Sequence, residues 1–272
     1  MATPNLELPN TSPTPGTPVE QGPPKFSKRQ FLTGAVAGAC LLQSGRWIAG
    51  GIASKDEDKP ANSFAQSGED LIGGMIFDYL KLPLKTYLDI GAADPVHINN
   101  TYLFYLCGAR GVLVEPNPEM TARLRSKRPR DTVLPVGIGA TTEKEMDFFR
   151  TSEPTWNTFD KEVAESYSRV TNGRVTIQEV VKIPLVNINE VFVEHFEGKA
   201  PDFISLDVEG FELPILQSLD FDKYRPKMFC VETLVGGTFK QKLEAVEFLV
   251  SKGYEARGAT LANSILLDKQ LT

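Results

Sequence analysis

Short apolar runs alternate with helical segments from residue 64 to the end of the chain, and this alternation constrains the fold more than any other feature. The runs are rich in β-branched and aromatic residues, which indicates strands buried on both faces. The predicted strands lie in residues 85–91, 110–116, 131–139, 201–210, 227–233 and 261–268. Strands that alternate with helices predict an α/β fold with a doubly wound, mostly parallel sheet.

Apolar periodicity and capping signals predict helices between these strands. Helices are expected in 68–82, in 100–108, after Asn117 and in 238–253. Asn117 offers a capping side chain just before Pro118, the residue type favoured at the first helical position. The apolar stripe predicted for the helix in 68–82 consists of Leu71, Ile72, Met75, Ile76, Tyr79 and Leu80.

Composition divides the chain into four segments. Residues 1–24 are rich in Pro and Thr and predict disorder, because such a segment buries too little apolar surface to offset its ordering entropy. Residues 25–53 predict a signal or a membrane-associated segment, and 54–63 a charged linker. The folded domain follows at 64–272, where the polar stretch 140–182 predicts an insertion on the substrate side.

Charge and residue usage exclude several classes of function. The chain has 29 basic and 35 acidic residues, a net charge of −6, which argues against a nucleic-acid-binding protein. The basic run 122–130 (ARLRSKRPR) predicts a solvated helix face or, as an alternative, a contact for an anionic substrate or a lipid headgroup. Three scattered cysteines and two histidines provide neither a disulfide framework nor a multi-histidine metal site, so no metal is expected.

Acidic residues stand at the ends of three predicted strands. Asp89, Glu115 and Asp207 each follow an apolar run. Ligands of doubly wound sheets bind beyond the carboxyl ends of the strands, so these acids predict a site for a ligand rich in hydroxyl and amino groups. Glu115 lies 24 residues beyond Gly91, where a carboxylate can accept hydrogen bonds from both hydroxyls of a ribose.

The loop after the first strand distinguishes between two nucleotide ligands. A dinucleotide site uses G-x-G-x-x-G, because the backbone must approach a pyrophosphate. Here the loop has a single Gly91, with Asp89 before it and Asp94 within it. Negative charge at these positions repels a pyrophosphate and attracts the sulfonium and ammonium groups of S-adenosylmethionine. The loop therefore argues against a nucleotide-dependent oxidoreductase.

Several separated blocks of residues 64–267 together resemble one known family. The blocks are FAQSGEDL, YLDIGAADP, NNTYLF, GARGVLVEPNP, ISLDVEGFE, RPKMFCVE and LANSILL. They are similar to FkbM-type S-adenosylmethionine-dependent methyltransferases, most of which are thought to methylate hydroxyl oxygens of sugars, polyketides and similar metabolites. The resemblance implies a Rossmann-like class I methyltransferase fold, with S-adenosylmethionine as the cofactor.

The resemblance also implies roles for individual residues. The cofactor-binding residues expected on this basis are Asp89, Gly91, Ala92, Asp94, Glu115, Asn117, Gln66 and Asp70. Among them, Asp89, Gly91 and Ala92 would form the loop on the methionine side, and Glu115 would bind the ribose. Gln66 and Asp70 would pack over the cofactor loop, although N-capping of the first helix is the alternative. Gly137 and Ile138 are the guesses for the adenine side.

The reaction implied by the resemblance needs a general base, because a hydroxyl acceptor must lose its proton. The candidates are Asp207, Glu209 and His97. Asp207 has the alternative of capping the next helix, Glu209 that of a first-turn acid beside the helix dipole, and His97 that of a solvated loop side chain. Trp156 in the predicted insertion is a hypothetical contact for a sugar-like acceptor.

The favoured function is therefore O-methylation of a small-molecule hydroxyl acceptor, such as a sugar, a lipid-linked glycan or a secondary metabolite. The alternatives are a methyltransferase-like domain that binds a ligand or partner without turnover and, less favoured, a Rossmann-type oxidoreductase. A cofactor made in the cytoplasm favours a cytoplasmic or membrane-associated domain. Residues 27–32 (SKRQFL) resemble a twin-arginine export motif instead, so both locations stay open.

Overall fold

The computed structural model describes residues 63–139, 144–236, 238 and 240–272. Predictions for 1–24, 25–53 and nearly all of 54–63 lie outside these residues. Within the described part of the chain, no helix is both long enough and apolar enough to cross a membrane.

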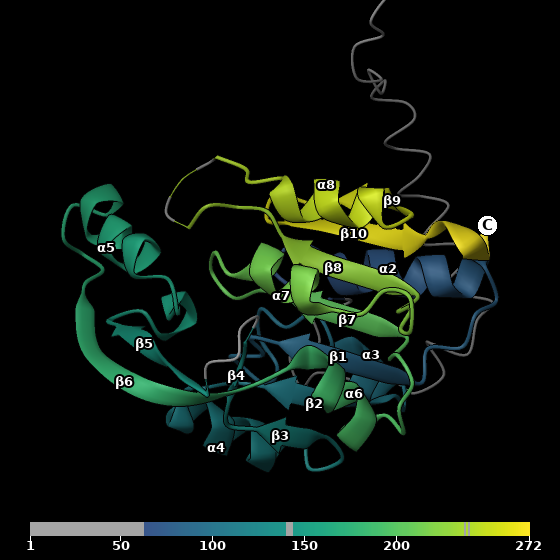
Figure 1. The fold of residues 1–272 in the computed structure, drawn as a ribbon, viewed down its shortest axis with the longest axis horizontal. Helices are drawn as coiled ribbons and strands as arrows, with labels where there is room; N and C mark the ends of the chain where they lie inside the picture. The colour runs from purple at the N-terminus through teal and green to yellow at the C-terminus, as the bar shows by residue number, and fades with distance from the viewer. Residues whose placement is uncertain (1–62, 140–143, 237, 239) are drawn as a thin grey trace, which may run out of the picture. The chain divides into compact units, whose positions relative to one another are not determined.

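A seven-stranded sheet forms the centre of this domain, with the strand order β3-β2-β1-β7-β8-β10-β9 (Figure 1). Its strands are β1 (Thr86–Ile90), β2 (Arg110–Val114), β3 (Thr132–Leu134), β7 (Phe203–Leu206), β8 (Met228–Glu232), β9 (Tyr254–Ala259) and β10 (Asn263–Asp268). Five strands, β3 to β8 in this order, are parallel, and β10 is antiparallel to both of its neighbours. The predicted doubly wound, mostly parallel sheet is confirmed.

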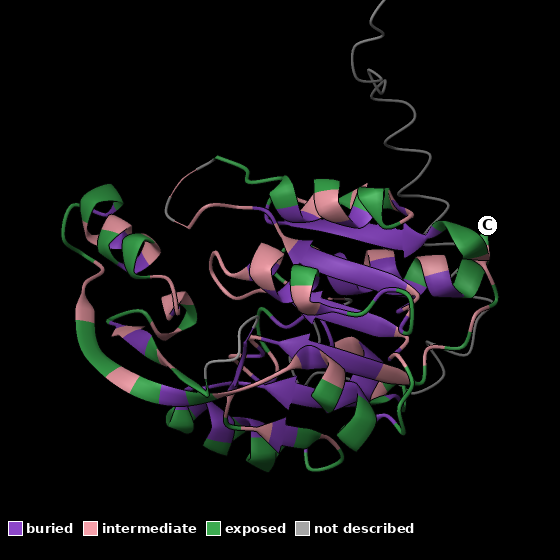
Figure 2. Ribbon diagram, viewed as in Figure 1, coloured by how far each residue is buried: buried purple, intermediate pink, exposed green. Residues whose placement is uncertain are grey.

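Helices cover both faces of this sheet, so the strands β1, β2, β7, β8 and β10 are almost entirely buried (Figure 2). One face packs against α2 (Glu69–Tyr79), α3 (Tyr102–Leu106) and α4 (Pro118–Lys127). The other face packs against α6 (Ile188–His195), α7 (Glu212–Ser218) and α8 (Glu244–Ser251). The chain runs outward from β1 through β2 to β3 and later from β7 to β8 on the other side, so the strand order reverses between β1 and β7.

A smaller sheet with the order β4-β6-β5 occupies the predicted insertion and extends beyond the central sheet (Figure 1). It contains β4 (Gly137–Ile138), β5 (Glu145–Thr151) and β6 (Ile177–Val186), with the helix α5 (Lys161–Val170) and a 3-10 turn, η1 (Pro154–Trp156), between β5 and β6. A second 3-10 turn, η2 (Lys269–Leu271), follows β10. No strand was predicted in this segment, because most of β6 is exposed and alternates polar with apolar residues only irregularly.

Two predicted elements differ from the structure, and one strand was not predicted. The single strand expected in 131–139 is split into β3 and β4 around Pro135, a residue that cannot donate a ladder hydrogen bond. The helix expected in 238–253 begins only at Glu244, because Leu234 and Gln241 first form an isolated β-bridge. Strand β9 was missed, since its sequence YEARGA has no apolar run.

The predicted apolar stripe of α2 is correct only in part, because Ile72, Ile76 and Leu80 pack against the core while two other members are exposed. Met75 is 40% exposed and Tyr79 is 78% exposed. The buried residues of this helix are Glu69, Asp70, Gly73, Gly74 and Phe77. The glycines let the helix approach the sheet, and the two acids are buried because their carboxylates accept hydrogen bonds from Ser63, Ser67 and the backbone.

Candidate active site

A cavity opens at the carboxyl end of the central sheet, where the strand order reverses between β1 and β7. Its walls include Gly91 after β1, Glu115 after β2, and Asp207 and Glu209 after β7. The insertion supplies another wall, which includes Phe148. The strand-end acids predicted from the sequence therefore gather around one edge of the sheet.

Gly91 lets the loop after β1 pass directly over the end of β7. Its φ is +83°, and a Cβ atom built on it would lie 1.7 Å from the carbonyl oxygen of Asp207. The backbones are close because β1 and β7 pair to their ends, where the Asp207 amide donates to the Ile90 carbonyl at 3.0 Å. No other residue type fits at this position.

Glu115 is the acid whose carboxylate is best held in place to bind a ribose. Its side chain is 6% exposed, and one carboxylate oxygen accepts from the Ala93 amide at 3.0 Å while the other accepts from the Asn117 amide at 2.7 Å. Burial raises the pKa of Glu115 to about 7, against the effect of these two amides. The amides fix the carboxylate at the cavity wall, and each oxygen keeps a lone pair with which to accept a hydroxyl.

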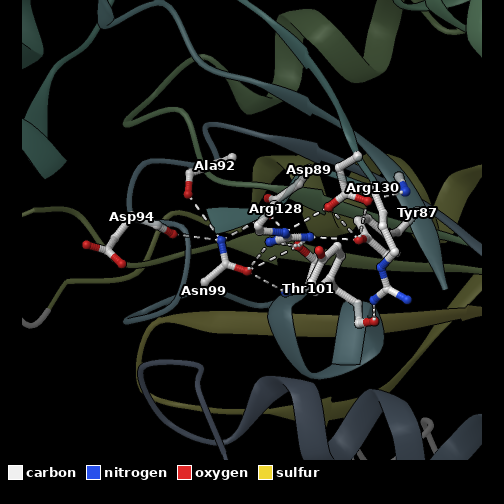
Figure 3. Close-up of polar contacts among 11 residues, drawn as sticks. Tyr87, Asp89, Ala92, Asp94, Asn99, Thr101, Arg128 and Arg130 are labelled. Carbon is white, nitrogen blue, oxygen red and sulfur yellow. Dashed lines mark hydrogen bonds and ion pairs between the residues drawn. The ribbon is translucent and has the colours of Figure 1, made fainter. Parts of the chain in front are cut away.

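Asp89 lies beneath the loop rather than in the cavity wall. It is 3% exposed, and its carboxylate accepts from the Thr101 hydroxyl at 2.7 Å and from the Asn99 side-chain amide at 3.3 Å. The Asn99 amide also donates to the carbonyl oxygens of Ala92 and Asp94 (Figure 3). Asp89 thus supports residues 92–94 of the cofactor loop through Asn99.

Arg128 anchors this network from the basic run in 122–130. Its side chain is fully buried, with hydrogen bonds to the Asn99 amide oxygen at 3.0 Å, the Tyr87 hydroxyl at 2.8 Å and the Asp131 carboxylate at 2.8 Å (Figure 3). Both interpretations of the basic run are wrong for this residue, because the Arg128 side chain is buried among groups of the domain itself. A single sequence contains no signal that separates this arginine from its exposed neighbours on α4.

Asp94 and His97 both line the cavity. The Asp94 carboxylate accepts from the amides of Val96 and His97 at 2.9 Å each and pairs with Arg123 at 2.6 Å. Partial burial would raise the pKa of Asp94, but these amides and the Arg123 guanidinium outweigh it and lower the pKa. Asp94 therefore carries a negative charge at the rim of the cavity, beside the exposed imidazole of His97.

Four other residues expected to bind the cofactor do not line the cavity: Ala92, Asn117, Gln66 and Asp70. Ala92 packs in the core, and Asn117 caps α4 by accepting from the Glu119 amide at 3.1 Å. Gln66 is exposed. The Asp70 carboxylate accepts a hydrogen bond from the Phe64 backbone amide at 2.7 Å, and the Phe64 carbonyl accepts one from the backbone amide of Asn99. Asp70 therefore contacts the cofactor loop only indirectly.

The acids after β7 form a cluster with one further residue. One carboxylate oxygen each of Asp207, Glu209 and Glu232 lies within 4.8 Å of the others. Burial and the nearby Glu212 charge raise the pKa of Asp207 to about 7, and burial and the Asp207 charge raise that of Glu209 to about 8. Glu232 was not among the predicted site residues, although it ends the apolar run 227–233 just as the other acids end theirs.

The alternative roles of Asp207 and Glu209 differ from what the structure contains. Glu212, not Asp207, accepts from the first free amides before α7, those of Val208 and Gly210, at 3.1 Å each. Glu209 precedes α7 in a left-handed conformation with φ of +53°, and it accepts a hydrogen bond from Tyr167. Trp156 does not line the cavity.

Residues 89–256 match the family model of the methyltransferase FkbM domain, which is more than half of the chain. The chain belongs to the FkbM methyltransferase family. It is therefore an S-adenosylmethionine-dependent methyltransferase with a Rossmann-like class I fold. No curated protein matches the chain.

Solved methyltransferase structures are similar at low identity. A TehB-like SAM-dependent methyltransferase from Corynebacterium glutamicum shares 11% identity at a TM-score of 0.41, over 86% of this chain and 100% of that chain. An O-methyltransferase from Bacillus cereus, in complex with SAH, shares 11% identity at a TM-score of 0.38, over 90% of this chain and 92% of that chain. The 1,6-didemethyltoxoflavin-N1-methyltransferase of Burkholderia thailandensis shares 12% identity at a TM-score of 0.36, over 90% of this chain and 91% of that chain.

S-adenosylmethionine fits the residues of the cavity as the cofactor of this FkbM methyltransferase. Glu115 would hold the ribose hydroxyls, and the backbone at Gly91 and Ala93 can approach the ligand closely. Gly137 and Ile138, the residues guessed for the adenine side, line the same cavity. A Cβ atom on Gly137 would lie 2.5 Å from the Phe159 ring, so the narrow wall there depends on glycine.

Proposed function

We propose that this FkbM methyltransferase methylates a hydroxyl oxygen of an uncharged, sugar-like or secondary-metabolite acceptor. When bound, S-adenosylmethionine supplies an electrophilic methyl group on a sulfonium and becomes the neutral thioether S-adenosylhomocysteine. The chain's own residues must hold the acceptor in line with that methyl group and remove the hydroxyl proton.

One observation carries this proposal. Asp207 and Glu209 line the same cavity as Gly91 and Glu115, and the pKa values of both acids are raised close to neutrality. A general base works best when its pKa is near the working pH, because it must be ionised and still bind a proton. A carboxylate in this position favours a reaction that removes a proton from the acceptor.

Each of the three candidate residues has a different place in the proton transfer. The Asp207 carboxylate is the base that accepts the hydroxyl proton. The Glu209 carboxylate lies beside it and is held in place by a hydrogen bond from the Tyr167 hydroxyl at 2.5 Å. His97 lies at the exposed side of the cavity, where an imidazole can pass a proton on to water.

The cavity wall favours an uncharged acceptor. Among the described residues that line the cavity, none is Lys or Arg, so nothing there compensates a phosphate or carboxylate. The insertion contributes Thr155 and Asn157 next to the rings of Phe148 and Phe159. Hydroxyl and amide groups beside aromatic rings suit a polyol with an apolar face.

The test is a transfer assay with the full chain and methyl-labelled S-adenosylmethionine. The acceptors are a panel of glycosides and polyols, each paired with an analogue in which an amine replaces a hydroxyl. We expect labelled methyl ethers, a rate loss of about 10²–10⁴-fold in Asp207→Asn, and no loss in Glu197→Gln, whose side chain is 86% exposed. Label that appears only on amines, or cofactor binding without any transfer, would contradict the proposal.

A further inference from the structure

Glu232 ends β8 beside the end of β7, which brings its carboxylate to Asp207. The two strands are parallel and pair Leu206 with Val231, so Asp207 and Glu232 follow at the same level. A carboxylate oxygen of each acid lies within 4.8 Å of one of the other, so a proton between the two side chains can form a hydrogen bond. Since ionised carboxylates have no proton to donate, such a bond requires that one of the two acids is protonated.

The surroundings of the pair contain more negative than positive charge. The titratable groups that face it are Glu69 on α2, Asp89 on β1, Glu209 and Glu212 around the start of α7, Tyr167 on α5, and Lys242, which acts on Glu212. Adjacent carboxylates in such a setting cannot both ionise at neutral pH, so they hold one proton between them.

The surroundings favour Glu232, which does not line the cavity, as the holder of this proton. Burial and the charges of Asp207 and Glu209 raise the pKa of Glu232 well above its usual range, and the hydrogen bond to Asp207 raises it further. The same hydrogen bond lowers the pKa of Asp207. Asp207 is therefore the ionised member of the pair, and it is Asp207 that lines the cavity.

We propose that Glu232 is a positioning residue for the methyl transfer, which donates a shared proton to Asp207 and so orients the Asp207 carboxylate as the base. This inference rests on the proposed function, in which Asp207 accepts the hydroxyl proton. The acceptor O–H bond breaks, its proton goes to Asp207, and its electron pair stays on the oxygen. That oxygen forms the bond to the methyl carbon, while the electrons of the old carbon–sulfur bond stay on sulfur. The pair is then doubly protonated and returns one proton to water.

Two variants separate this role from a structural one. Glu232→Gln keeps the shape and always donates a hydrogen bond, but it removes the negative charge and the shared proton. The titration midpoint of the Asp207 carboxyl group should then fall by about one pH unit or more. The acidic limb of the plot of methyl-transfer rate against pH should move with it. Glu232→Asp keeps a titrating carboxyl group and should restore the two-step titration in part.

The experiment follows the carboxyl carbons by ¹³C NMR in the full chain labelled in Asp and Glu, with Asp207→Asn and Glu232→Gln to assign the signals. Glu247→Gln, at an exposed position of α8, is the matched control. We expect Asp207 and Glu232 to titrate as one coupled unit in two steps, with the upper step near or above neutral pH. Glu232→Gln should leave Asp207 with one step at lower pH, and Glu247→Gln should change nothing.

Two results would overturn the inference. One is a Glu232 signal that titrates alone below pH 5 with the Asp207 signal unaffected, on the scale of an ordinary glutamate. The other is a shift of the three carboxyl signals of Asp207, Glu209 and Glu232 on addition of Mg²⁺ or Ca²⁺, which would show a cation in place of the proton. If instead the pair titrates as expected but Asp207→Asn transfers methyl groups normally, the proposed function fails and the coupled pair remains.

Discussion

The Tyr167 hydroxyl donates a 2.5 Å hydrogen bond to the carboxylate of Glu209, which joins α5 of the insertion to the end of β7. Tyr167 is fully buried, so no water replaces this bond if it is removed. Tyr167→Phe should lower the free energy of unfolding by about 1.5–3 kcal/mol, the usual range for a hydrogen bond to a charged group. Denaturant titration at pH 9, where Glu209 is ionised, measures this loss.

The same variant should lose less stability at pH 5. Glu209 has a pKa of about 8 and is protonated at pH 5, where the tyrosine bond is no longer charge-assisted. Tyr79→Phe is the control, since Tyr79 is 78% exposed and its hydroxyl is solvated. Equal losses at pH 5 and pH 9 would show that the Tyr167 hydroxyl does not act on the ionised carboxylate.

The raised pKa of Glu209 also predicts how stability changes with pH. The folded state holds a proton on Glu209 up to about pH 8, whereas a free glutamate releases it near pH 4.5. The stabilising effect of this proton is complete below pH 4.5 and is lost as the pH rises to 8. The free energy of unfolding of Glu209→Gln should therefore rise relative to that of the wild type by up to about 1.4 kcal/mol per pH unit in this window. Melting curves of both proteins from pH 4.5 to 8.5 test this, and parallel curves would contradict it.

Arg128 should be the residue of the basic run on which stability depends. Arg128→Met keeps most of the side-chain volume but removes the bonds to Asn99, Tyr87 and Asp131. Breaking a buried ion pair from one side costs about 3–5 kcal/mol. Because Asn99 holds the cofactor loop, the affinity for S-adenosylmethionine should fall as well.

Arg125→Met provides the matched control, because Arg125 lies in the last turn of α4, next to the C-cap Arg128, and is exposed. Denaturant titration and calorimetric binding of both variants measure the two effects. If the two substitutions cost the same, the buried network around Arg128 contributes nothing specific to the fold or to the loop.

Gly91→Ala should disrupt the crossing of the loop over β7. The new Cβ atom would lie 1.7 Å from the Asp207 carbonyl oxygen, so strands β1 and β7 must separate. We expect a loss of at least about 3 kcal/mol, from the left-handed backbone conformation and from overpacking together. Gly108 also has a left-handed φ, of +96°, but a Cβ atom there would meet nothing within 4 Å. Gly108→Ala should therefore lower the free energy of unfolding by only about 1–2 kcal/mol. Similar losses for the two would contradict this close approach.

The sequence was sufficient to predict the central sheet and the edge at which its acids gather. Strands β1, β2, β7 and β8 are buried on both faces, so their apolar runs stand out against the helices. Gly91, Glu115 and Asp207 end such runs, and the reversal of strand order brings them to one cavity.

The remaining parts depend on tertiary contacts that periodicity does not report. Strand β6 is mostly exposed and pairs with β5 across the insertion, so its sequence lacks the long apolar run of a buried strand. The buried face of α2 begins with two acids whose partners come from elsewhere in the chain, such as Thr260 on Glu69. Asp89 and Arg128 look like exposed site residues in the sequence and become a buried support for the loop only through Asn99.

The most direct test of the methyltransferase assignment is calorimetric titration of the full chain with S-adenosylmethionine, in the wild type, Glu115→Gln and Glu119→Gln. The wild type should bind. Glu115→Gln should bind about 10–100-fold more weakly, because it loses a charged acceptor for the ribose hydroxyls worth about 1.5–3 kcal/mol. Glu119→Gln, at a side chain that is 75% exposed, should bind like the wild type. A wild-type chain that is folded but does not bind S-adenosylmethionine would contradict the account.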